Sequence, residues 1–155
     1  MGEHHPAVVP REAQALADRV GASMWERDDA SQGLGMRLVR IAPGEATLTM
    51  AVRRDMLNGH AICHGGFVFT LADSAFAFAC NSYNANTVAA GCSIEFLAPA
   101  HEGDVLTAVA RERTLAGRSG VYDIDVRNQH GATIAVFRGK SARIRGHVVP
   151  PAAGD

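Results

Sequence analysis

The chain has 155 residues and a mass of 16.4 kDa, the size of one ordinary domain, and 47% of its residues are hydrophobic while 20% are charged. This composition is that of a globular protein and excludes a disordered, collagen-like or coiled-coil chain. Fifteen Lys and Arg against sixteen Asp and Glu give a formal charge of -1, so the overall charge attracts the chain neither to nucleic acid nor to anionic lipid.

Cysteine content and the N-terminal residues favour a cytoplasmic protein. The three cysteines form no C-x-x-C pair, and an odd number is more typical of a reducing compartment than of a disulfide framework. Residues 1–6 lack the basic and then apolar run of a secretory signal. The longest stretch without charge or His, 74–94, carries three asparagines whose amides would be unpaired in lipid, so we expect no membrane span.

The first part of the chain is predicted to be helical. Between Arg11 and about Ala30 apolar side chains recur at helical spacing, with Gly21 as a bend. This pattern predicts one or two short helices that cover an edge of the domain. We divide the single domain, 1–155, into an N-terminal helical segment at 1–34, a core at 36–145 and a loose tail at 146–155.

The core begins with a predicted hairpin. Residues 46–53 alternate between apolar and more polar side chains, the two-residue period of a half-buried strand, and the Pro-Gly-Glu turn at 43–45 joins them to a strand at 36–41. A loop of about ten residues follows at 54–63. It opens onto His64-Gly65-Gly66.

The stretch from Phe67 to Cys80 has eleven apolar residues out of fourteen and no strand-like alternation, which predicts a buried helix. Alternating apolar residues then return around four short stretches, at 92–96, 106–110, 122–126 and 134–136. This order predicts an α+β fold in which an antiparallel meander sheet wraps around one helix. Such a sheet has free edges, so we expect a partner chain and a dimer.

Asp73 is the strongest candidate for a catalytic group, because an ionised carboxylate within an apolar helix carries a desolvation cost of several kcal/mol unless another group compensates it. A structural alternative remains open, in which Asp73 faces solvent or binds nearby backbone.

Gly65 and Gly66 place backbone N–H groups at the start of the predicted helix, where the helix dipole favours a developing oxyanion. Two glycines equally allow a close approach of loop and helix without any catalytic role. Eight residues separate Gly65 from Asp73, or about 12 Å along a helix axis. We therefore expect two antiparallel helices of a dimer to bring Gly65 of one chain to Asp73 of the other, which gives two composite sites.

Six motifs stand out together in the core: Met56-Leu57-Asn58-Gly59-His60, His64-Gly65-Gly66, Leu71-Ala72-Asp73-Ser74-Ala75-Phe76-Ala77, Ala79-Cys80-Asn81-Ser82, Gly120-Val121-Tyr122-Asp123-Ile124 and Phe137-Arg138-Gly139-Lys140-Ser141. On these motifs the chain resembles the phenylacetate-degradation branch of acyl-CoA thioesterases in the hotdog-fold superfamily, and the resemblance spans roughly residues 36–145.

The resemblance implies a hotdog fold, a homotetramer built as a dimer of dimers, and hydrolysis of aromatic acyl-CoA thioesters, above all ring-hydroxylated phenylacetyl-CoA. It also implies that Asp73 is the catalytic carboxylate and that Gly65 donates its N–H to the thioester carbonyl. Asp73 either attacks the thioester, forming a mixed anhydride, or deprotonates a water; the sequence leaves both open.

Other residues are assigned supporting roles. We expect the Asn58 amide near the nucleophilic water or the carbonyl, and His64 as a residue that shapes the loop rather than a base. Gly66 is a candidate for substrate binding. Three residues in a turn and near the end of the last strand, Arg118, Ser119 and Lys140, are candidates for the phosphates or pantetheine arm of CoA. No cofactor beyond the CoA of the substrate is expected.

Other interpretations have weaker support. The H-x-x-x-H pattern of His60 and His64 lacks a third metal ligand, so we expect no metal site. Neither Cys63 nor Ser74 lies in a recognised nucleophile motif. A hotdog hydratase or dehydratase would require a His and acid pair, and an acyl-CoA sensor would require a DNA-reading module. Both remain as alternatives to hydrolysis.

Overall fold

The computed structural model describes residues 8–152; the features predicted for residues 1–6 and the last three residues of the expected tail lie outside this range. The elements run in the order α1 (Arg11–Glu26), α2 (Asp29–Gly33), β1 (Arg37–Ala42), β2 (Glu45–Ala51), the 3-10 turn η1 (Arg54–Met56), α3 (Gly65–Asn81), β3 (Ala85–Phe96), β4 (Val105–Ala116), β5 (Ser119–Arg127) and β6 (Thr133–His147).

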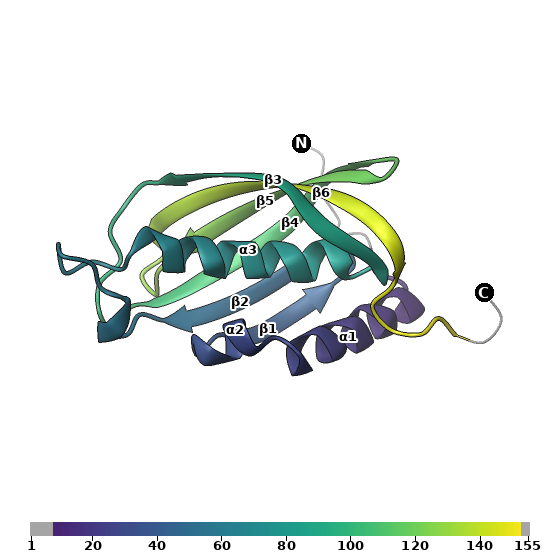
Figure 1. The fold of residues 1–155 in the computed structure, drawn as a ribbon, viewed down its shortest axis with the longest axis horizontal. Coiled ribbons are helices and arrows are strands. Elements are labelled where there is room, and N and C mark those ends of the chain that lie inside the picture. Colours follow the sequence, from purple (N-terminus) through teal and green to yellow (C-terminus); the bar gives the residue numbers. More distant parts are fainter. Residues whose placement is uncertain (1–7, 153–155) are drawn as a thin grey trace.

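A six-stranded antiparallel sheet in the order β1-β2-β4-β5-β6-β3 curves around α3, which lies along its concave face (Figure 1). The predicted α+β class, with one long helix wrapped by an antiparallel sheet, is confirmed. Within residues 8–152, no helix is long and apolar enough to cross a membrane.

Burial along α3 explains why this apolar segment is a helix and how it is oriented. Leu71, Ala72, Ala75, Phe76, Phe78 and Ala79 are each at most 1% exposed and pack against the sheet. A second stripe is less buried and carries the polar side chains of Thr70 and Asp73 together with Gly66, Phe69 and Ala77. The helix therefore presents one face to its own sheet and leaves the other incompletely covered.

The strand that follows α3 does not continue a simple meander. Strands β4, β5 and β6 do, but β3 pairs with β6 and becomes the far edge of the sheet. Three residues join α3 to β3, so the strand must start beside the end of the helix. The Asn81 side chain fixes this return, because it donates to Thr87 O at 3.0 Å and accepts from Thr87 N at 2.9 Å.

The N-terminal segment forms two helices, and α1 packs against the edge strand β1. The predicted bend at Gly21 is wrong, since α1 runs through it without interruption. Gly21 instead permits close packing, because a Cβ atom there would lie 2.9 Å from the Ile41 side chain.

The predicted loose tail begins too early. Strand β6 extends to His147, and the Asn84 side chain holds the next residues by donating to Val149 O at 3.0 Å and accepting from Val149 N at 2.8 Å. Arg19 Nη2 also donates to Pro150 O at 3.1 Å. Side-chain hydrogen bonds from Asn84 and Arg19 to its backbone therefore hold this segment at least as far as Pro150.

Candidate active site

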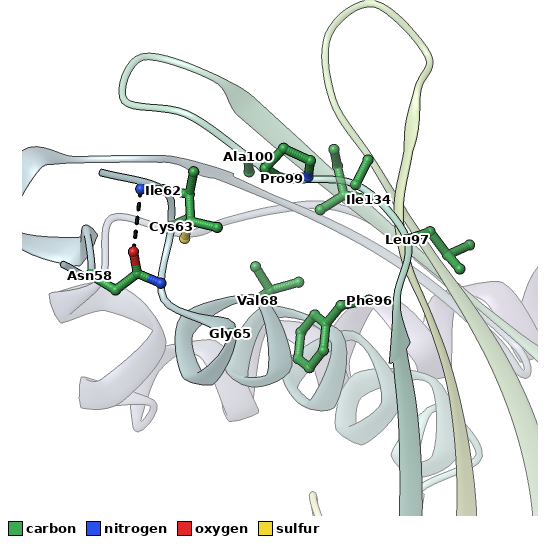
Figure 2. A pocket seen from close by; sticks show the side chains of 11 residues that line it. Asn58, Ile62, Cys63, Gly65, Val68, Phe96, Leu97, Pro99, Ala100 and Ile134 are labelled. Carbon is green, nitrogen blue, oxygen red and sulfur yellow. Dashed lines mark hydrogen bonds between the residues drawn. The ribbon is translucent and has the colours of Figure 1, made fainter. Parts of the chain in front are cut away.

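The loop before α3 is held by the side chain of Asn58. Its carboxamide oxygen accepts from His60 N at 2.9 Å and from Ile62 N at 3.4 Å, and its backbone N–H donates to Ile62 O at 2.9 Å. The amide nitrogen is turned toward the segment that leads into Gly65 (Figure 2) and donates no hydrogen bond to a residue of the described range. This leaves both N–H donors of the Asn58 side chain available to a ligand.

His64 caps the N-terminus of α3. Its Nδ1 accepts from Gly66 N at 3.0 Å, and its backbone N–H donates to Met56 O at 2.8 Å. The imidazole is thereby engaged in local structure, as N-cap side chains commonly are. The backbone N–H of Gly66 is occupied by this bond, so any contact of Gly66 with a substrate would use other atoms.

Gly65, in contrast, has a free amide. It begins α3, and its N–H donates to no acceptor among residues 8–152, so it combines an unused donor with the positive end of the helix dipole. The amide borders a cavity of about 490 Å³. Figure 2 shows the lining residues: Asn58, Ile62, Cys63, Gly65, Val68, Phe96, Leu97, Ala98, Pro99, Ala100 and Ile134.

Asp73 lies on the half-buried stripe of α3, two turns beyond Gly65. Its carboxylate makes no hydrogen bond or ion pair with any other described residue. Burial raises the pKa of Asp73 above its ordinary value. The charge of Asp73 in turn contributes to raising the pKa of Cys92 on β3, after the larger effect of burial. Asp73 thus lies near a thiol and lacks a compensating cation within the described chain.

The structure separates the two principal candidates. Gly65 and Asp73 belong to one continuous helix, about 12 Å apart along its axis, and Asp73 does not line the cavity beside Gly65. The structure thus brings Asn58 and Gly65 together, with His64 beside them, and places Asp73 elsewhere. A single thioester carbonyl cannot contact both Gly65 and Asp73 of one protomer.

The three candidates for CoA binding lie apart from this cavity. Arg118 and Ser119 lie near Cys80 and Tyr83, at the C-terminal end of α3, and the Arg118 guanidinium donates to Arg143 O at 3.0 and 3.3 Å. Lys140 is exposed on the outer face of the sheet, because its neighbour Gly139 faces Phe76 of α3 and side chains alternate along a strand. Within one protomer, none of the three adjoins Gly65.

Within the described part of the chain, no cluster of three or more His, Cys, Asp and Glu residues is arranged to hold a metal ion. His60 and His64 are on a loop whose hydrogen bonds run to its own backbone and to Asn58 and Gly66.

Phe96 and Leu97 line the cavity, although the sequence pattern does not mark them as site residues. The alternation of apolar residues predicts that Phe96 is a buried strand residue, but Phe96 and Leu97 are 54% and 61% exposed. The pattern alone does not show that this strand is at an edge of the sheet. The Pro99 that closely follows it was the available signal that pairing ends there.

Known proteins are similar to this chain over most of its length. The family model described as the thioesterase superfamily matches residues 60–135. The acyl-coenzyme A thioesterase PaaI of Escherichia coli strain K12 is 48% identical over 126 residues, which cover 81% of this chain and 90% of that protein.

Solved structures extend the comparison. The E. coli PaaI protein from the phenylacetic acid degradation operon superposes with a TM-score of 0.86 at 46% identity, over 87% of this chain and 98% of that one. A Streptococcus mutans UA159 protein crystallised with acetyl-CoA gives a TM-score of 0.70 at 25% identity, over 72% and 90% of the two chains.

Proposed function

Because the chain belongs to the thioesterase superfamily and has its hotdog fold, in the branch represented by E. coli PaaI, we propose that it hydrolyses aromatic acyl-CoA thioesters in phenylacetate degradation. Phenylacetyl-CoA and its ring-hydroxylated forms are the preferred substrates in this proposal. The substrate supplies its own CoA, and no further cofactor takes part.

One observation carries this proposal: α3 holds a free amide at its N-terminus and, two turns later, a half-buried carboxylate with no partner in the described chain. An amide at the positive end of a helix stabilises the oxyanion that forms when a thioester carbonyl is attacked. A desolvated carboxylate is a stronger base and nucleophile than one in water. Acyl transfer from sulfur to water needs these two groups.

In the reaction, the thioester carbonyl oxygen accepts a hydrogen bond from Gly65 N–H. Asp73 either removes a proton from the water that attacks the carbonyl carbon, or attacks that carbon itself and forms an anhydride that water then opens. In both routes the carbon–sulfur bond breaks and CoA leaves as its thiolate. Asn58 has two free side-chain N–H donors at the same cavity, suited to the carbonyl or to the attacking water.

In this proposal, a homodimer brings Gly65 of one subunit close to Asp73 of the other. Strand β3 is a free edge beside the exposed stripe of α3, and edges of this kind favour pairing with a second chain. A two-fold axis near Phe69 and Thr70 sets two α3 helices antiparallel, so that Gly65 faces Asp73 of the partner subunit. Two such dimers form the tetramer in our proposal.

The remaining assignments are proposals of the same kind. Arg118 and Ser119 near the end of α3, and Lys140 on the outer face, are offered as contacts for the phosphates and pantetheine arm of CoA. The three cysteines are free thiols in the structure, which accords with a cytoplasmic enzyme.

The test is release of free CoA from phenylacetyl-, hydroxyphenylacetyl-, benzoyl- and short aliphatic acyl-CoAs by the wild type and by Asp73→Asn. We expect preference for the aryl substrates and a loss of at least about a hundredfold in kcat for Asp73→Asn, the size typical of a lost general base. Size-exclusion chromatography of both proteins controls for folding and assembly. Equal activity of the two proteins would remove Asp73 from the reaction, and absence of any CoA release by the wild type would reject hydrolysis.

A further inference from the structure

The cavity beside Gly65 is lined mostly by apolar side chains, and the free donors of Gly65 and Asn58 lie on the same side of it (Figure 2). The free Gly65 amide and the Asn58 carboxamide are contributed by the loop and the start of α3, while Phe96, Leu97 and Pro99 enclose it from the end of β3 (Figure 2). A volume of about 490 Å³ falls within the range of small-molecule sites. A carbonyl bound at these donors therefore directs its acyl chain toward apolar side chains.

Phe96 lies directly against the proposed oxyanion donor. A Cβ atom on Gly65 would lie 2.9 Å from Cζ of the Phe96 ring, closer than real Cβ contacts allow, so the ring packs on the bare Cα of Gly65. The residue as a whole is 54% exposed. Its position at the end of an edge strand leaves it without the close aromatic neighbours that Phe69, Phe76 and Phe137 have.

We propose that this cavity is the acyl pocket and that Phe96 selects aromatic acyl groups by stacking its exposed ring on theirs. The inference rests on the proposed thioesterase function and adds to it the residue that sets acyl preference. Ring pairs in offset or edge-to-face geometry gain free energy beyond the area they bury, and a saturated ring of equal size does not. Phe96 is thus a specificity residue rather than a group that takes part in bond breaking.

The test uses two substrates whose acyl groups differ in whether the six-membered ring is aromatic or saturated. Phenylacetyl-CoA and cyclohexylacetyl-CoA have the same number of acyl carbons, so the ratio of their kcat/KM values measures the aromatic contribution rather than size. We expect Phe96→Leu to lower this ratio by about two- to tenfold, the range of a single aromatic pair, mainly through a higher KM for phenylacetyl-CoA.

Two further variants control the comparison. Phe96→Tyr retains the ring and should retain the ratio. Phe67→Leu makes the same chemical change one turn into α3, at a side chain that does not line the cavity, and should also retain the ratio. If Phe96→Leu fails to fold, Phe96→Met removes the ring with a flexible side chain of similar length.

Binding separates this inference from the proposed function. In an Asp73→Asn background, where turnover is slowed, calorimetry gives the dissociation constants of both thioesters with and without Phe96→Leu. Binding that loses its preference for phenylacetyl-CoA on Phe96→Leu supports the pocket even if the wild type releases no CoA, which would reject the hydrolase alone. A ratio unchanged by Phe96→Leu, in turnover or in binding, overturns the inference while leaving hydrolysis intact.

Discussion

Asp73 shows at the scale of one residue how a functional group opposes stability. Burial raises its pKa, so folding favours the protonated carboxyl. Between the ordinary pKa near 3.9 and the raised one, the folded state holds more protons than the unfolded state, and stability falls as the pH rises through this window. Above it, the ionised Asp73 reduces the stability of the folded protein.

Asp73→Asn should therefore be more thermostable than the wild type at neutral pH while being much less active. We expect a rise in Tm of at most about 2–4 °C, the effect of roughly 1 kcal/mol in a domain of this size, because the carboxylate retains solvent contact that screens it. Thermal unfolding followed by circular dichroism at pH 7.5 and at pH 3.5 measures it. The gain should disappear at the lower pH, and a gain that persists there would assign it to a cause other than charge.

Substitutions at Gly65 can test the role of its backbone amide hydrogen. Proline is well tolerated at the first position of a helix, and His64 already has the extended ψ of 133° that suits a residue before proline. Gly65→Pro removes the amide hydrogen, whereas Gly65→Ala keeps it; both add a Cβ that displaces the Phe96 ring.

We expect Gly65→Pro to be about a hundredfold or more lower in kcat than Gly65→Ala, which is the cost of one oxyanion donor. Gly65→Ala itself should lose much less, because the far end of the Phe96 ring can move. Steady-state kinetics with phenylacetyl-CoA decides this, with circular dichroism as the control for α3. Similar kcat values for both variants would show that steric contact with Phe96, and not the amide, makes Gly65 necessary.

At the scale of elements, a short hydrogen-bonded chain joins α2 to the catalytic helix. Ser31, which is 1% exposed, donates to Asp28 Oδ2 at 2.7 Å, and its oxygen lies 3.1 Å from the Ser74 hydroxyl. Since the Ser31 hydrogen is directed at Asp28, Ser74 is the donor to Ser31. Ser74 therefore anchors α3 to the N-terminal segment, although it is adjacent in sequence to Asp73.

Ser74→Ala should lower stability by about 1 kcal/mol, the usual net value of such a bond, and Tm by about 2–4 °C, with kcat nearly unchanged. Ser31 keeps its bond to Asp28, so no buried hydroxyl is left without a partner. Urea unfolding and CoA release on the same protein measure the two effects. A large loss of kcat with little loss of stability would instead assign Ser74 to the chemistry.

Some secondary-structure elements could be predicted from the sequence and others could not. The buried helix and the hairpin of β1 and β2 follow directly from apolar periodicity, and the separation of Gly65 from Asp73 follows from helical rise. The inner face of β6 was predicted wrongly: Ile134 and Val136 were expected to share it. Val136 instead lies opposite Asp125 of β5 and Glu95 of β3. Residues opposite one another share a face of the sheet, so the Val136 side chain is on the outer face.

The inner positions of β6 after Ile134 are Ala135, Phe137, Gly139 and Ser141. Small and polar side chains at these positions obscure the alternation, so the orientation of Lys140 could not be deduced. The exposed ring of Phe96 was hidden for another reason. It depends on β3 crossing to the far edge of the sheet, a long-range pairing that no local pattern records.

At the scale of the whole molecule, the composite site makes a prediction that no single-chain site shares. In the proposed dimer, each site takes Gly65 from one subunit and Asp73 from the other. Two inactive proteins, Asp73→Asn and Gly65→Pro, then complement each other, because a mixed dimer contains one site with both groups intact and one site with neither.

Random mixing of the two variants gives about half mixed dimers, each with one working site of two, so co-expression should restore about a quarter of wild-type kcat per protomer. Different affinity tags on the two chains allow tetramers that contain both variants to be isolated by tandem purification, and random pairing of the dimers gives these tetramers about two-sevenths of the wild-type kcat per protomer. Each variant purified alone serves as the baseline. If both groups acted within one protomer, every site in the mixed dimer would lack one of them, and its activity would stay at that baseline however the chains are combined.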